Sequence, residues 1–331
     1  MEKETQEQKQ QWTCPKGFKT MCGGQALIEG IMMRGPKKQS VVVRKQDGTM
    51  DVQVKELHFA KDKHPFLGWP LIRGGVNFFD AMYNGVTALM YSAEFFADEE
   101  GEEPEEPGRF EKWLDKHLGS EKAGKFFTTL AVVMGICMSV ALFFLLPTAL
   151  GTVVTFFTDS MLIRNVAESL LKIVIFVGYL AMCAHMKDMR RIFSYHGAEH
   201  KTIFCYEAGL PLTVENVRIQ PRHHPRCGTS FLFVVIFISI VVSSIVFTLW
   251  PIHNAFLRML AHLAMLPIVV GVSYEINRWV GRHDGPITRI IIAPGLWLQN
   301  FTTFEPDESM MEVGIKALEL VLPEEKGSDA W

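Results

Sequence analysis

The sequence of 331 residues lacks the motifs of several common enzyme classes. It has no phosphate-binding loop, no nucleophile elbow and no dinucleotide-binding fingerprint. The basic segment 187–228 lacks the interleaved aromatic residues of a nucleic-acid platform, so we expect no nucleic-acid partner. The sequence also has no internal repeat and no pair of broken helices of the kind that marks many transporters.

Cysteines are few and scattered, which argues against a disulfide framework. Two of the six, Cys137 and Cys183, lie within apolar segments. In a protein that faces the reducing cytosol, we expect the cysteines to be free thiols. The first twelve residues are polar and have no apolar core. We therefore expect no secretory signal peptide, and the first membrane span would act as the insertion signal.

Charged residues are absent from two long stretches, residues 126–157 and 229–250. Each stretch exceeds the roughly 20 residues that a helix needs to cross about 30 Å of hydrocarbon. Two shorter apolar segments, residues 173–186 and 260–274, are candidates for further spans, or for buried or re-entrant helices. The sequence predicts a mostly α-helical integral membrane protein with about four transmembrane helices.

Six segments follow from the pattern of polar, acidic and apolar residues. They are a polar tail (1–19), a small cytosolic β unit (20–69), an amphipathic helix (70–97), an acidic disordered linker (98–111), a membrane domain (112–304) that includes a cytosolic loop (187–228), and a C-terminal amphipathic helix with a tail (305–331). Within the β unit, valines on both sides of Asp47 and Gly48 predict a β-hairpin with a two-residue turn. Asp307 is a plausible N-cap of the last helix.

Basic residues mark one side of the predicted membrane domain. The loop 187–228 and the segment after the fourth span are rich in Lys and Arg, whereas the connection after the first span has only Arg164. The positive-inside rule then places both termini and the loop 187–228 in the cytosol, in a multi-pass protein of the cell membrane. Arg258 and His262 fall near the opposite side, where we expect packing or snorkelling.

The segment "SYHGAEHKT" contains the most specific chemical pattern. His196, Glu199 and His200 would share one face of a helix, since they are three and four residues apart. Two imidazoles at this spacing can hold one divalent ion while the carboxylate acts as a base, as in the H-x-x-E-H motif. The alternative is a pair of surface or core histidines, and Gly197 weakens the helix.

Further candidate ligands lie on the same predicted loop. His224 and Cys227 in "RHHPRCG" could complete a tetrahedral site, and Glu207 lies near the histidine motif. The alternative is that His-Pro and Cys-Gly only punctuate a loop before the next span. Three ligands would leave an open position for catalysis, and four would make a structural site.

Two glycine-containing segments leave their roles open. "GGQALIEGIMMRGP", with Glu29 alone among apolar residues, indicates either backbone that passes close to the site or a tight turn that leads into a strand. "PITRIIIAPGLWLQNFTTF", with adjacent Pro294 and Gly295, predicts an interfacial or re-entrant turn.

Three stretches together resemble a known family: "GGQALIEGIMMRGP", "YHGAEHKTI" with the following "HPRCGTSF", and "APGLWLQNFTTFEPDESMMEVGIKAL". They are similar to the YqhQ-like family of uncharacterised bacterial multi-pass membrane proteins, which are described as predicted metal-dependent enzymes. The resemblance covers residues 23–322. It implies a metal-dependent site at residues that this sequence retains: His196, Glu199, His200, His224 and Cys227.

The hypothesis that follows is a hydrolytic, metal-dependent enzyme at the cytosolic membrane surface. Its divalent ion, zinc by ligand type, would be held by His196 and His200 with a third ligand from His224, Cys227 or Glu207. Glu199 would be the catalytic base. Besides the lipid bilayer, the partner would be a membrane protein or lipid substrate. The alternative is a non-catalytic scaffold or assembly factor with a structural histidine cluster.

The charge pattern generates a test of topology. We expect the segment around Lys201 and the residues after Pro323 to lie on the same, cytosolic side of the membrane. Cysteines introduced at the two places should react with a membrane-impermeant maleimide only after the cells are opened. Labelling of either position in intact cells would contradict the orientation.

Overall fold

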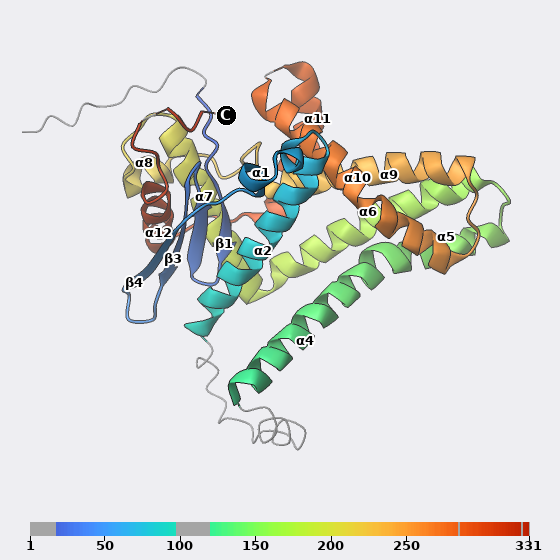
Figure 1. The fold of residues 1–331 in the computed structure, drawn as a ribbon, viewed down its shortest axis with the longest axis horizontal. Coiled ribbons are helices and arrows are strands. Elements are labelled where there is room, and N and C mark those ends of the chain that lie inside the picture. Colours follow the sequence, from blue (N-terminus) through green and yellow to red (C-terminus); the bar gives the residue numbers. More distant parts are fainter. Residues whose placement is uncertain (1–17, 97–119, 284, 326, 331) are drawn as a thin grey trace, which may run out of the picture. The chain divides into compact units, whose positions relative to one another are not determined.

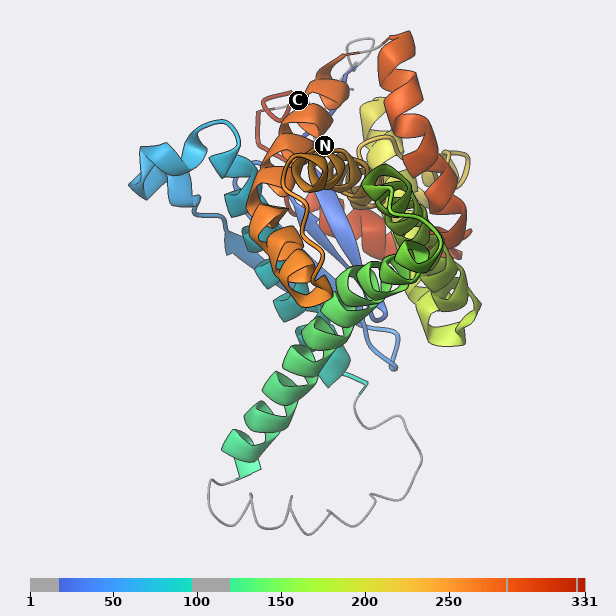
Figure 2. The ribbon, with the colours of Figure 1, turned by 90° about the vertical axis from the view of Figure 1, so that its right-hand side faces the viewer.

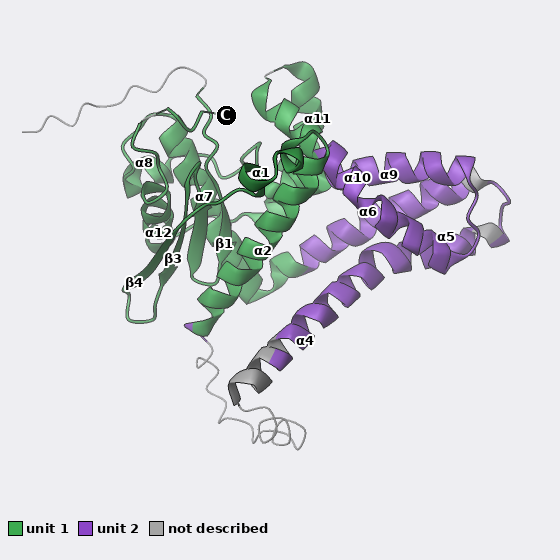
Figure 3. Cartoon of the chain, in the orientation of Figure 1, with its two compact units in different colours: residues 1–94, 183–233, 274–331 green, residues 95–182, 234–273 purple. Residues whose placement is uncertain are grey.

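The computed structural model describes residues 18–96, 120–283, 285–325 and 327–330 (Figure 1). The predicted polar tail lies almost wholly, and the predicted acidic linker entirely, outside these residues. The chain forms two compact units (Figure 3). Unit 1 combines residues 1–94, 183–233 and 274–331, and unit 2 combines residues 95–182 and 234–273. Unit 1 thus brings together the predicted β unit, the predicted loop 187–228 and the C-terminal helix.

Unit 1 is built on a four-stranded antiparallel sheet in the order β1-β2-β3-β4. The strands are β1 (Gly23–Leu27), β2 (Gly30–Arg34), β3 (Lys38–Arg44) and β4 (Met50–Glu56). The sequence predicted the β3–β4 hairpin, but it left open whether "GGQALIEGIMMRGP" contains a strand. Both faces of β2 are buried, so its apolar residues run consecutively and lack the alternation that marks a strand with one exposed face.

The turn between β3 and β4 is longer than predicted. The last pair of the ladder is Arg44 with Met50, and the backbone N–H of Lys45 donates to Thr49 O at 2.8 Å. Only Gly48 has a positive φ, of 81°. A two-residue type I′ turn needs two such residues, whereas a three-residue loop needs one, so the predicted two-residue turn is wrong.

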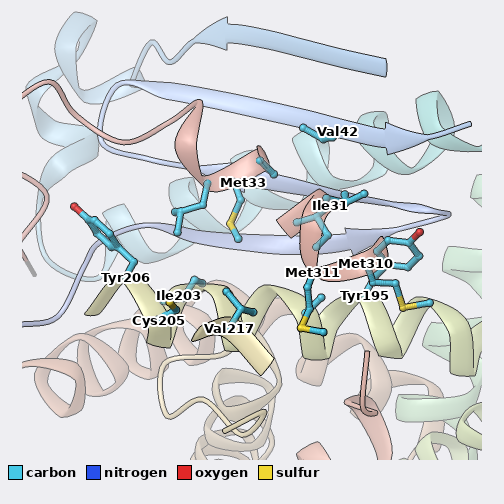
Figure 4. Close-up of a cluster of buried hydrophobic side chains, with 14 of the residues drawn as sticks. Ile31, Met33, Val42, Tyr195, Ile203, Cys205, Tyr206, Val217, Met310 and Met311 are labelled. Atoms are coloured by element: carbon cyan, nitrogen blue, oxygen red, sulfur yellow. The ribbon is translucent and has the colours of Figure 1, made fainter. Parts of the chain in front are cut away.

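One face of the sheet packs against α7 (Lys187–Glu207) and α12 (Glu308–Glu319), and the short α8 (Val214–Arg218) packs against these two helices. Figure 4 shows side chains from the sheet, α7, α8 and α12 meeting in this core, among them Ile31, Val42, Tyr195 and Met311. Asp307 caps α12 as predicted, because its side chain accepts the Met310 N–H at 2.9 Å.

The other face of the sheet packs against α2 (Ile72–Glu94), a helix where the sequence predicted one. Its buried residues are mainly small or polar, whereas Phe79 and Tyr83 of its apolar residues are exposed. Lys55 Nζ of β4 donates to Asn84 Oδ1 of α2 at 2.6 Å. Two short elements, α1 (Ala60–Lys63) and η1 (Pro65–Gly68), connect β4 to α2. The sheet is therefore enclosed between two helical layers, which explains why its central strands are buried.

The segment with Pro294 and Gly295 forms a continuous helix, α11 (Pro286–Thr302), and the predicted turn is wrong. Gly295 lies against Ser230, where a Cβ would come within 2.6 Å of the Ser230 Cα. The glycine is explained by this close helix contact, and a proline is tolerated inside a helix of a membrane protein.

Long helices make up unit 2 and its connections to unit 1: α4 (Ser120–Val140), the π-turn η2 (Ala141–Leu145), α5 (Leu146–Val153), η3 (Val154–Phe156), α6 (Met161–His185), α9 (Gly228–Leu249) and α10 (Ala255–Arg282) (Figure 2). Among the residues that the structure describes, four helical stretches are long and apolar enough to cross a membrane: Thr129–Val153, Ile163–His185, Gly228–Leu249 and Ala255–Arg282. The predicted helical membrane protein with four spans is confirmed as a fold class. The second and fourth spans are longer than the apolar segments 173–186 and 260–274 from which they were predicted. Each helix also includes buried charged residues, which interrupt the apolar pattern in the sequence.

Gly197 has a packing role that generates a test. A Cβ at this position of α7 would lie 2.1 Å from the Phe304 carbonyl oxygen. Gly197→Ala should therefore lower the free energy of unfolding by about 1–3 kcal/mol, as overpacking does. In α2, a Cβ on Gly75 meets nothing within 4 Å. Gly75→Ala should leave stability unchanged or raise it by about 0.4–1 kcal/mol. Thermal unfolding in detergent measures both, and equal losses would refute the packing role.

Candidate metal centre

Three side chains of unit 1 converge on one buried point. His196 and His200 come from successive turns of α7, and Cys227 comes from the residue before α9. Their ligand atoms all lie within 4.8 Å of one another. His196 Nε2 is 3.2 Å from Cys227 Sγ, and the centroids of the two imidazole rings are 4.3 Å apart. Two nitrogens and one sulfur in this arrangement are a donor set that zinc prefers.

Contacts with the β1–β2 turn hold α7 on the sheet. Glu29 has a positive φ of 49° in this turn, and its carboxylate forms an ion pair with Arg191. The Tyr195 hydroxyl donates to Glu29 Oε2 at 3.0 Å. Glu29, isolated among apolar residues in the sequence, therefore anchors the turn of α7 just before His196.

Backbone carbonyls orient both imidazoles. His196 Nδ1 lies 2.8 Å from Thr302 O, and His200 Nδ1 lies 2.6 Å from Arg222 O. A carbonyl only accepts, so each Nδ1 carries the proton and each Nε2 is directed at the common point. His200 Nε2 is buried and has no hydrogen-bond partner within the described chain. An oriented imidazole with an unpartnered nitrogen is what a metal ligand requires, so these residues fit a metal ion.

The Cys227 thiol and the His196 imidazole strongly affect each other's protonation. Burial alone raises the pKa of a thiol, but the charges of His196 and His200 lower the pKa of Cys227 well below its usual value. Burial likewise opposes protonation of His196, and the nearby Cys227 overcomes it and raises the pKa of His196 to about 9. The neighbouring imidazoles therefore favour the thiolate, which is the form of cysteine that binds metal.

Glu199 lies beside the three ligands and is only 4 % exposed. Its Oε1 accepts the backbone N–H of Gly24 at 2.9 Å, and its Oε2 is buried without a partner among the residues described. Burial raises the pKa of this carboxyl. A Cβ on Gly24 would lie 3.1 Å from Glu199 Cδ and 2.5 Å from Met32 O, so the glycine permits the approach. Both interpretations of the glycine-rich segment therefore hold: it forms a hairpin, and its backbone contacts the site.

The structure places the other two candidate ligands in a neighbouring cluster. His224 Nε2 lies 3.7 Å from Glu207 Oε2, and Glu207 is also paired with Arg226. Burial lowers the pKa of His224 to about 4, which keeps this imidazole neutral. Of the three candidates for third ligand, the structure brings Cys227 next to both histidines. The metal role of each candidate stays a prediction.

Sequence reasoning missed the contribution of α11. Gln299 is fully buried, and its Oε1 accepts the His224 N–H at 2.7 Å. Its Nε2 donates to the His224 carbonyl at 2.8 Å. This paired contact fixes the segment that carries Cys227, while Thr302 of the same helix orients His196. The available signal was a lone glutamine in the apolar run "GLWLQNF", since a buried amide needs partners.

The fold and the site define a helical, multi-pass membrane protein with a buried cluster of two histidines and a cysteine. Residues 69–324 match the model of a family described as "Protein of unknown function (DUF1385)", and the chain belongs to this family. It is 34 % identical over 308 residues to "Uncharacterized protein YqhQ" of Bacillus subtilis (strain 168), a match that covers 91 % of this chain and 92 % of that protein. The resemblance to the YqhQ-like family is confirmed. No solved structure matches the chain.

Metal retention is the direct test of the site. Protein purified without chelators and loaded with Zn²⁺ should retain about one ion per chain. His200→Ala and Cys227→Ser should each abolish retention, because loss of one of three ligands removes most of the affinity. The exposed His58 is the matched control, and His58→Ala should bind as the wild type does. With Co²⁺, a cobalt–thiolate absorption band should appear and should vanish in Cys227→Ser. Unchanged metal content in both site variants would refute the site.

Proposed function

We propose that the protein is a membrane-bound, metal-dependent hydrolase whose ion is held by His196, His200 and Cys227. Catalytic zinc sites have three protein ligands and keep one position open, whereas structural sites have four. A set of three converging ligands supports the catalytic alternative over a structural cluster. A bound Zn²⁺ would supply Lewis-acid chemistry and lower the pKa of a water molecule.

The position of Glu199 carries this proposal. The free oxygen of this buried carboxylate has no partner among the residues described, and Gly24 fixes the other oxygen. Burial raises its pKa, which brings its basicity closer to that of an effective general base. Glu199 would take a proton from water and return it to the leaving group, while the hydrogen bond from Gly24 keeps the carboxylate in place.

The substrate class follows from the membrane helices. We propose a membrane-associated peptide or lipid, because four spans hold the chain in the bilayer and the site residues adjoin one of them at Cys227. The basic residues at the span ends support a site on the cytosolic side. Under this proposal the substrate arrives along the membrane surface.

A second candidate function uses the cysteine directly. His196 Nε2 is 3.2 Å from Cys227 Sγ, and its Nδ1 is held by Thr302 O. A thiolate beside an oriented imidazolium is the arrangement of a cysteine nucleophile. The two candidates respond oppositely to metal. A chelator would abolish activity of the metal enzyme, whereas zinc would inhibit the thiol enzyme by occupying its nucleophile.

Glu199→Gln separates catalysis from metal binding. The variant keeps the shape of the side chain, so it should retain its metal and its fold but fail to complement a deletion strain. Elemental analysis and complementation are measured together, and Glu319→Gln, at an exposed position of α12, is the control. If Glu199→Gln loses the ion, Glu199 is a ligand and its proposed role is wrong. If it retains the ion and complements fully, a non-catalytic scaffold replaces the enzyme.

A further inference from the structure

Unit 2 contains a buried cluster of charged residues that the proposed hydrolase does not use. Arg164, Glu168 and Lys172 lie at four-residue intervals on α6, and Arg258 and His262 lie four residues apart on α10. Both arginines are 1 % exposed, and all five lie in helices of the structure that are long and apolar enough to cross a membrane. Ionisable residues at such positions are costly and usually functional. The sequence predicted only packing or snorkelling for Arg258 and His262.

Glu168 is the carboxylate of this cluster, and both of its oxygens are used. Its Oε2 accepts from Arg258 Nε at 2.8 Å. Its Oε1 accepts from Thr148 Oγ1 at 2.8 Å and lies 3.3 Å from Lys172 Nζ. His262 Nε2 is 2.9 Å from the same oxygen and 3.1 Å from Lys172 Nζ. The His262 Nε2 atom either donates to Glu168 or accepts from Lys172, but it cannot do both. If it donates, three donors share the single oxygen Oε1, so the cluster has more donors than acceptors.

The two arginines confirm the shortage of acceptors. Arg258 Nη2 donates to Asn165 Oδ1 at 2.5 Å, and its guanidinium stacks 3.9 Å from the Phe247 ring centroid. Arg164 Nη2 donates to Thr152 Oγ1 at 3.2 Å. Arg258 Nη1 and Arg164 Nε are buried and have no partner in the described part of unit 2. Each arginine therefore has an unused, buried N–H group.

The charges of the cluster do not balance. Arg164, Lys172 and Arg258 contribute three positive charges against one negative charge from Glu168, which leaves two positive charges when His262 is neutral. Buried charges without counter-ions strongly lower the stability of the fold, even after local relaxation. An anion that accepts from the unused N–H groups of both arginines would satisfy both the charge and the hydrogen bonds.

We propose that Arg164 and Arg258 bind a phosphate group in the membrane domain. The planar fork of arginine matches phosphate oxygens, and such charge-assisted hydrogen bonds are the strong ones. Each arginine is the fourth residue of its helix, about 5 Å from the helix start, and helix N-termini favour anions. The phosphate comes either from an anionic phospholipid or from a dissolved phosphate ion. This inference is independent of the proposed hydrolase, since it uses none of the same residues.

The experiment uses the full-length protein in lipid nanodiscs and compares three conditions. These are phosphatidylcholine alone, phosphatidylcholine with phosphatidylglycerol, and phosphatidylcholine with added inorganic phosphate. Thermal unfolding reports the stabilisation by each phosphate source, and native mass spectrometry reports retained lipid. Stabilisation by phosphatidylglycerol alone identifies a lipid headgroup, and stabilisation by inorganic phosphate identifies the dissolved ion.

Substitution of Arg164 tests whether this side chain binds the phosphate group. If the site binds phosphate, the variant should bind the effective source at least about tenfold more weakly, since one charge-assisted contact is lost. Arg164→Lys keeps the charge but loses the fork, so it should bind with intermediate affinity and serves if the glutamine variant does not fold. Arg282→Gln, at an exposed position of α10 outside the cluster, should bind as the wild type does.

Two outcomes would overturn the proposal. In one, neither phosphatidylglycerol nor inorganic phosphate stabilises the wild type, and Arg164→Gln is as stable as the wild type or more stable. The cluster would then be a structural network hydrated by water. In the other, Arg282→Gln loses binding as fully as Arg164→Gln does, which would assign the effect to general surface charge.

Discussion

The polar side chains on α7 are buried over two turns of the helix, so they must find partners inside unit 1. Glu29 of the β1–β2 turn holds Arg191 and Tyr195, the Gly24 N–H holds Glu199, and carbonyls of two other segments hold the imidazoles. Helix α7 therefore holds together segments of unit 1 that are distant from one another in the sequence. The candidate site exists because these bonds leave two buried atoms without partners, His200 Nε2 and Glu199 Oε2.

The two units contain opposite imbalances of polar groups. In unit 1, two of the buried atoms without partners are an imidazole nitrogen and a carboxylate oxygen close to Cys227, and together these groups would attract a cation. In unit 2, two buried arginines have N–H groups without partners, which would attract an anion. A buried group without a partner lowers stability, so in each unit the imbalance marks the place where a ligand would stabilise the fold.

Glycines have specific structural roles in unit 1. Gly24 lets β1 approach Glu199, Gly197 lets α7 approach the carbonyl of Phe304, and Gly295 lets α11 approach Ser230. In each case a Cβ would lie closer to a neighbouring atom than van der Waals contact allows. The weak helix propensity of Gly197 therefore has a packing explanation. These close approaches bring α7 against β1 and against the segment that follows α11, and they bring α11 against α9.

The sequence by itself determined the spans, the helix α2, the capped helix α12 and the shared face of His196, Glu199 and His200. Each depends on local periodicity, which a single segment contains. The third converging residue, the roles of Gly24 and Gln299, and the pairing of Arg258 and His262 with Glu168 were decided only by tertiary structure. These contacts join residues that lie from 31 to 175 positions apart in the chain. No local pattern encodes such distances, because they depend on how buried polar groups from separate elements satisfy one another.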